Sequence, residues 1–166
     1  MDSIALAYLK RPKYAFTLDY GQKAALAEIN AARQVSKELS IDHHIIRVDC
    51  GSLGSGDMSS KPSISMSPVS EWWPYRNQLL VTLACMKGVV LGINELIVGS
   101  VKTDDAHKDG TMEFYSYLST LVQYQEGAIK ISCPYKESKS NFVSNAFPSF
   151  MNNIIAPASK NIPDVT

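Results

Sequence analysis

An alternation of strand-like and helix-like segments in the first fifty residues constrains the fold most strongly. Residues 14–19 are rich in β-branched and aromatic side chains and lie between Pro12 and Gly21, which is typical of a strand. Apolar residues then repeat at helical spacing over residues 22–39, and a second apolar strand is expected over residues 43–49. A strand, a helix and a strand joined by short connections favour a right-handed crossover. We therefore expect an α/β fold with a parallel sheet.

The later residues continue the alternation of helices and strands. We expect helices over residues 1–9, 75–91 and 112–125, and strands over residues 95–99 and 128–133. Two of these helices carry apolar side chains at helical spacing, and we expect these to be buried: Leu79, Leu83, Met86 and Val90 in one, and Phe114, Leu118 and Leu121 in the other. This pattern ends near Ser140, which predicts a folded domain over residues 1–140 and an irregular tail over residues 141–166.

Composition excludes several classes of function. The 166 residues carry no formal net charge, which gives no support to a nucleic-acid partner. No apolar run approaches the ~18 residues of a membrane span, and the first residues do not resemble a signal peptide, so we expect a cytoplasmic protein. Cys50, Cys85 and Cys133 are far apart, and together with the three histidines they show no metal-site spacing. We expect the cysteines to be buried as small apolar residues.

Two segments have the residue types of a nucleotide or anion site. In the turn from residue 19 to residue 22, Gln22 can reach a base or a ribose, or the segment is an ordinary strand-to-helix turn. Arg76 and Asn77 begin a helix, where backbone N–H groups and a guanidinium favour phosphate or carboxylate, although a solvated arginine is the alternative. Trp72, Trp73 and Tyr75 precede them and either stack on a heterocycle or pack in the core.

A polar loop after the strand at 95–99 adds carboxylates. Asp104, Asp105 and Asp109 suit either Mg²⁺ with nucleotide phosphates or the ring N–H groups of a purine, unless the loop is merely solvated. Lys139 follows the last strand and is either a phosphate ligand or a solvated lysine.

Taken in order, five short motifs resemble the PP-loop ATP pyrophosphatases, and within them the 7-cyano-7-deazaguanine synthases. The first is similar to the second half of their Ser-Gly-Gly-x-Asp-Ser loop, and the others to their Asp-Tyr-Gly-Gln, Pro-x-Arg-Asn, Gly…Thr-Asp…Asp…Glu-Phe and Pro…Lys motifs. The matching residues are Met1-Asp2-Ser3, Asp19-Tyr20-Gly21-Gln22, Pro74-Tyr75-Arg76-Asn77, Gly99 with Thr103-Asp104, Asp109 and Glu113-Phe114, and Pro134 with Lys139.

The resemblance implies a doubly wound parallel sheet, ATP and Mg²⁺ as cofactors, and adenylation of a carboxylate. In that family the carboxylate belongs to 7-carboxy-7-deazaguanine, a small-molecule precursor in queuosine-type synthesis, and ammonia then gives an amide that is dehydrated to the nitrile.

The resemblance also implies roles for individual residues. Those expected to be catalytic are Arg76, Asp104, Asp109 and Lys139, and those expected to bind the cofactor are Asp2 and Ser3 at the pyrophosphate, Tyr20 and Gln22 near adenosine, Asn77 and Gly99.

Three departures from the family pattern leave the function open. The first strand and the Ser-Gly-Gly segment have no counterpart, so we expect a fragment, or a start placed too late, that binds ATP weakly. The four cysteines of the family's zinc site are also without counterparts, so zinc is not expected here. Asp109 is followed by Gly110-Thr111 where the synthases have Cys-Arg, which removes a cation that would face the substrate.

These departures keep other functions in view. One alternative is a non-catalytic module that binds a nucleotide or purine. Another is a related ligase that joins a deazapurine to an acceptor protein, and a homodimer is compatible with each. A tRNA-thiolating relative is a weaker alternative, because it would need a reactive cysteine pair and a basic surface for RNA.

Overall fold

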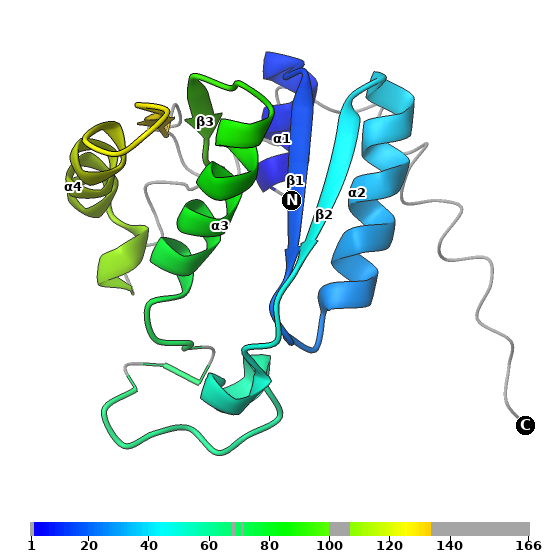
Figure 1. Ribbon diagram of the computed structural model, residues 1–166. Coiled ribbons are helices and arrows are strands. Elements are labelled where there is room, and N and C mark those ends of the chain that lie inside the picture. Colours follow the sequence, from blue (N-terminus) through cyan, green and yellow to red (C-terminus); the bar gives the residue numbers. More distant parts are fainter. Residues whose placement is uncertain (1, 68, 71, 100–106, 134–166) are drawn as a thin grey trace, which may run out of the picture.

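The computed structural model describes residues 2–67, 69–70, 72–99 and 107–133, and it is a mixed α/β structure with parallel strands (Figure 1). The elements in chain order are α1 (Asp2–Lys10), β1 (Tyr14–Asp19), α2 (Ala25–Leu39), β2 (Asp42–Arg47), the 3-10 turns η1 (Gly51–Leu53) and η2 (Gly56–Met58), α3 (Arg76–Val90), β3 (Glu95–Ile97), the 3-10 turn η3 (Lys108–Gly110), α4 (Met112–Gln123) and β4 (Lys130–Ser132). The predicted order of helices and strands is confirmed.

The strands form two parallel pairs. β1 pairs with β2 from Tyr14 opposite Asp42 to Asp19 opposite Arg47, and α2 makes the predicted crossover between them. β3 pairs with β4 in the same sense, starting with Glu95 opposite Lys130. Among the described residues the two pairs remain separate two-stranded sheets. The parallel arrangement is therefore confirmed, while a single doubly wound sheet stays a prediction.

Each parallel pair has its own core. α1 and α2 meet over one face of β1, where buried Val35, Leu39 and Ile41 contact Ala15 and the apolar side of α1. The second core lies between α3, α4 and the β3–β4 pair, and it is the larger one: Val81, Cys85, Tyr115, Leu118, Val122, Ile129 and Ile131. Because such cores are close-packed, each fixes the position of its helices.

The buried face of α3 differs from the prediction. Val81, Ala84, Cys85 and Gly88 face the core, whereas Met86 is 64% exposed and Val90 is 78% exposed. The reason is the size of the residues. A Cβ on Gly88 would lie 2.5 Å from Ile93 Cδ1, so small residues let α3 approach the segment before β3 closely. Leu79 and Leu83 are half-buried, so selecting the bulkiest apolar residues was right only in part and missed the small residues that face the core.

The predicted buried face of α4 is also right only in part. Leu118 is buried as predicted and Phe114 packs against the core, but Leu121 is 51% exposed. Its predicted place is taken by Val122, with Tyr115 buried two turns earlier. The core-facing stripe of α4 thus mixes aromatic and β-branched residues.

Several predicted ends move by a few residues. Helix α2 starts at Ala25 rather than at residue 22, because residues 20–24 form a turn, and β2 ends at Arg47 rather than at Asp49.

The prediction that all three cysteines are buried is right for Cys85, and burial raises the pKa of its thiol. Cys50 and Cys133 are only half-buried. None of the helices in the described ranges has the length and apolar character needed to cross a bilayer. Residues 141–166 lie outside the described residues, so the domain boundary stays a prediction.

Two valines on α3 test the corrected face of this helix. We expect Val81→Ala to lower the free energy of unfolding by about 2 kcal/mol, because Val81 is 4% exposed and its loss leaves a cavity. Val90→Ala is the matched control and should change it by less than about 0.5 kcal/mol. Urea unfolding followed by circular dichroism measures both. Equal effects of the two substitutions would contradict the observed packing.

Candidate functional site

Several predicted site residues lie at one end of the molecule. In Figure 1, β1 and β2 end at the bottom, and α3 starts there. The loop after β2 lies below the ends of the two strands and the start of α3. In this loop the Met58 carbonyl accepts a hydrogen bond from the backbone N–H of Lys23 (3.0 Å). α3 also contacts η3. The carboxyl ends of parallel strands and a helix N-terminus thus share this end, where α/β proteins commonly bind ligands.

The turn after β1 is held by Gln22, which is only 5% exposed. Its Oε1 accepts a hydrogen bond from the N–H of Tyr20, and its Nε2 donates to the Leu18 carbonyl and to Glu28, each at 2.9 Å. Gly21 has a φ of +94°, and a Cβ there would come within 3.2 Å of Gly51. The side-chain amide of Gln22 is therefore engaged within the protein, and its proposed place near adenosine remains a prediction.

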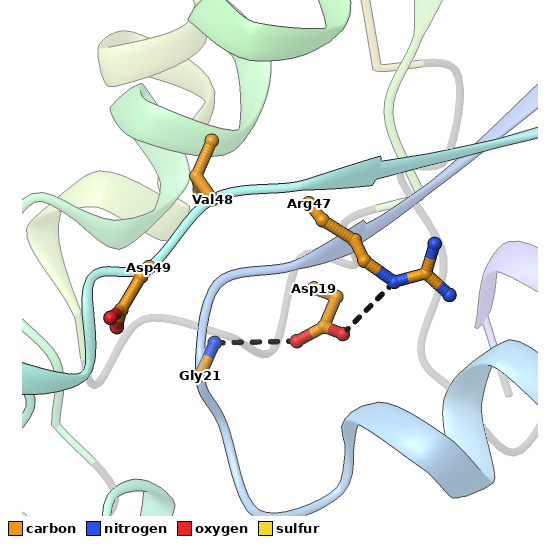
Figure 2. A pocket seen from close by; sticks show the side chains of 5 residues that line it. All are labelled: Asp19, Gly21, Arg47, Val48 and Asp49. Atoms are coloured by element: carbon orange, nitrogen blue, oxygen red, sulfur yellow. Dashed lines mark hydrogen bonds and ion pairs between the residues drawn. The ribbon is translucent and has the colours of Figure 1, made fainter.

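An open pocket of about 320 Å³ lies at the carboxyl ends of β1 and β2 (Figure 2). It is lined by Asp19, Gly21, Arg47, Val48 and Asp49. The Asp19 carboxylate accepts a hydrogen bond from the N–H of Gly21 (3.4 Å) and lies 3.7 Å from Arg47 Nε. The pocket is a largely open depression, and three of its five lining residues are charged, which suits a polar ligand more than an apolar one.

Asn77 and Asp109 are joined by two hydrogen bonds. The Asp109 carboxylate accepts from the backbone N–H of Asn77 (3.2 Å), and Asn77 Nδ2 donates to the Asp109 backbone carbonyl (2.9 Å). Tyr75, the N-cap residue of α3, makes no capping hydrogen bond with its side chain. Asp109 therefore caps α3 from η3, and its negative charge lies where the helix dipole favours it.

Arg76 is a half-buried cation beside this cap. Its Nε donates to Asn77 Oδ1 (3.2 Å), and its Nη1 contacts the sulfur of Met58 (3.2 Å). Both acceptors are neutral. In the described part of the chain no carboxylate lies within ion-pair distance of this guanidinium. A cation without a paired anion at a helix N-terminus is suited to binding an anionic ligand.

Tyr20 and Trp73 pack together behind Arg76. Their rings meet edge to face with centroids 4.9 Å apart, and they are 4% and 3% exposed. Burial raises the pKa of Tyr20 to about 12, against the opposing effect of the nearby Arg76 cation. The phenol is therefore neutral at neutral pH. Trp73 belongs to the packed interior, which leaves it unable to stack on a ligand.

The remaining predicted residues are placed as follows. Ser3 is exposed in the first turn of α1, which Asp2 begins, and α1 runs antiparallel to β1, so this turn points towards the site end (Figure 1). Gly99 follows β3. Asp104 and Lys139 lie outside the described residues. The structure thus brings Tyr20, Arg76, Asn77 and Asp109 together and leaves the roles of all the predicted residues as predictions.

One contributor to the site was missed by the sequence analysis. Met58 contacts Arg76 through its sulfur and the turn after β1 through its backbone. Met58 lies in the connection over residues 51–70, which is rich in Ser, Gly and Pro and has no periodicity, so nothing in the sequence distinguishes Met58 from its neighbours. The signal available in the sequence is the length of this connection, because long loops in compact domains are commonly functional.

A metal centre is not formed by the residues that can be placed. Within residues 2–67, 69–70, 72–99 and 107–133, no three His, Cys, Asp or Glu side chains form a group able to hold an ion. His107 is the N-cap of η3, and its Nδ1 makes no hydrogen bond with another described residue.

The fold and this cluster define an α/β protein with a polar site of mixed charge, which lies at the carboxyl ends of parallel strands and the start of a helix. The chain belongs to the family described as "Queuosine biosynthesis protein QueC", whose model matches residues 1–147. This finding confirms the resemblance seen in the motifs.

Curated relatives agree with the family assignment. The chain is 29% identical over 118 residues to a 7-cyano-7-deazaguanine synthase of Thermoplasma volcanium, a match that covers 66% of this chain and 48% of the relative. It is 30% identical over 144 residues to the synthase of Thiobacillus denitrificans, covering 78% of this chain and 64% of the relative. The chain thus spans about half to two thirds of the length of these relatives.

The raised pKa of Tyr20 predicts a pH effect on stability. Above about pH 10 the unfolded chain releases the phenol proton while the folded chain keeps it, so the contribution of Tyr20 is complete below about pH 10 and is lost as the pH approaches 12. Tyr20→Phe should therefore lose stability less steeply than the wild type in this range. Tyr124→Phe, at a residue 90% exposed, should keep the wild-type slope. Urea unfolding at several alkaline pH values tests this, and a wild-type slope for Tyr20→Phe would contradict the burial.

Proposed function

We propose that this chain takes part in ATP-dependent activation of a carboxylate, with 7-carboxy-7-deazaguanine as the substrate. One structural observation supports it most: Arg76 is a half-buried cation without an ionic partner in the described residues, at the start of α3. The family assignment supplies the chemistry, because the matched relatives are named 7-cyano-7-deazaguanine synthases.

The proposed reaction begins at the substrate carboxylate. A carboxylate oxygen attacks the α-phosphorus of ATP, the bond to pyrophosphate breaks, and an acyl adenylate forms. Ammonia then attacks the acyl carbon, and AMP leaves with the carboxylate oxygen to give the amide. A second ATP activates the amide oxygen for its departure as the nitrile forms. The residues in this proposal position the reactants and stabilise charge, and none of them acts as a general base.

We assign roles to the described side chains according to where they lie, and to Asp2, Asp104 and Lys139 from the family resemblance alone. Arg76 holds the carboxylate or a phosphate, and the α3 N-terminus adds positive potential. Asn77 and Asp109 keep this helix end in place. The nucleotide occupies the end of the molecule that carries the pocket at Asp19 and Asp49, with Tyr20 and Gln22 near adenosine. Asp2 and Ser3 lie towards the pyrophosphate, and Gly99, Asp104 and Lys139 complete the site.

Mg²⁺ stays part of the proposal, held by the nucleotide phosphates with one or two carboxylates, for which Asp104 and Asp109 are the candidates. The described ranges contain no group of three side chains that would hold a zinc ion, and no step here is routed through either metal. We further propose that the two strand pairs belong to one doubly wound sheet, and that the protein acts in the cytoplasm on a small molecule. The acceptor amine is ammonia or an amine of a partner protein, and a homodimer is compatible with both.

Arg76 provides the direct test. We expect Arg76→Ala to lower kcat/KM for 7-carboxy-7-deazaguanine by about 10²–10³-fold, because a group that stabilises developing charge is lost. Arg76→Lys should recover only part of this loss, since lysine cannot bind bidentately. Circular dichroism should show a folded protein in each case. Arg33→Ala, on the exposed side of α2, is the control and should retain full activity.

Calorimetric titration separates this proposal from the alternatives. Binding of both ATP and the purine acid, with AMP formed on mixing, supports carboxylate activation. Binding of the purine without ATP would favour a non-catalytic module. Unchanged turnover in Arg76→Ala would remove Arg76 from the site and with it the main structural support.

A further inference from the structure

Tyr75 has an unfavourable backbone conformation. Its φ of 57° and ψ of 16° lie in the left-handed region, which bulky L-residues rarely adopt. Glycine or asparagine normally occupies such a position. Tyr75 nevertheless carries a large aromatic ring that is 78% exposed, between Pro74 and Arg76.

Local structure does not account for the tyrosine. Its side chain gives α3 no capping hydrogen bond, and its ring makes none of the aromatic or cation–π contacts formed among the described residues. Two other non-glycine residues with positive φ have a local explanation, because they end helices. Arg11 follows α1 and its backbone N–H donates to the Ala7 carbonyl (3.0 Å), and Ser40 is the left-handed C-cap of α2. Strained residues of this kind are concentrated at functional sites.

The position of Tyr75 at the start of α3 indicates the kind of ligand. It directly precedes Arg76, so the same helix start carries a flat, exposed ring and a cation that has no anionic partner in the described residues. Among the described aromatics close to this point, Trp73 and Tyr20 are buried against each other and Trp72 is half-buried, so Tyr75 has the most exposed ring. A ligand with both a planar heterocycle and a carboxylate matches this pair of neighbours.

We propose that Tyr75 stacks on the heterocycle of the substrate whose carboxylate Arg76 binds, and that it is a specificity-determining residue. This inference rests on the proposed function. It explains why a bulky residue is kept in a conformation that glycine would adopt with less strain.

Substitutions at Tyr75 separate stacking from stability. Tyr75→Phe keeps the ring and should keep affinity for 7-carboxy-7-deazaguanine. Tyr75→Leu and Tyr75→Gly remove the ring and should weaken binding by about 5- to 150-fold. Tyr75→Gly should also raise the Tm by about 2–4 °C, because the strain is relieved. Ser40→Gly is the matched control: it relieves a similar φ far from the site and should raise the Tm with unchanged affinity.

A second ligand separates the roles of the ring and the guanidinium. 7-Deazaguanine lacks the carboxylate. Tyr75→Leu should weaken the binding of this ligand by the same factor as it weakens the binding of 7-carboxy-7-deazaguanine, whereas Arg76→Ala should have little effect on its affinity. Wild-type affinity in Tyr75→Gly would overturn the stacking role alone. A lower Tm in Tyr75→Gly would identify a packing residue and would also overturn it. Failure of the wild-type chain to bind either purine would overturn the proposed function and this inference together.

Discussion

The contact between Asp109 and Asn77 fixes the geometry on which the candidate site depends. It places a carboxylate on the first turn of α3 and ties that turn to the segment leading into α4. Without this cap, the N-terminal N–H groups of α3 would lack a protein acceptor from that side, and the helix start could fray. Because Arg76 is the first residue of α3, the direction of its guanidinium depends directly on this cap.

The site lies where two separately packed halves meet. One half contains β1, β2, α1 and α2, and the other contains α3, α4, β3 and β4, each with its own core. Near the site the halves are connected through the Tyr20–Trp73 ring contact and the Met58–Arg76 contact. Any ligand bound by Arg76 therefore also adjoins the turn after β1, which provides a physical reason for substrate binding to strengthen the association of the halves.

Sequence reasoning recovered what periodicity and turn chemistry determine. The crossover from β1 through α2 to β2 followed from local patterns, and so did the grouping of Arg76 and Asn77 at a helix start. The buried face of α3 could not be predicted in this way, because close approach at Gly88 selects small residues over large ones. The contact of Met58 with Arg76 and the internal hydrogen bonds of Gln22 depend on tertiary structure, for which the sequence has no periodic signal.

Hydrogen–deuterium exchange with and without 7-carboxy-7-deazaguanine tests the location of the site most directly. We predict slower exchange in residues 19–24, 73–79 and 107–114, because the ligand would bridge the turn after β1, the start of α3 and η3. The α1–β1 connection at residues 10–14, at the opposite end of β1, should be unchanged. No protection at all, or protection confined to residues 10–14, would contradict a substrate site at the start of α3.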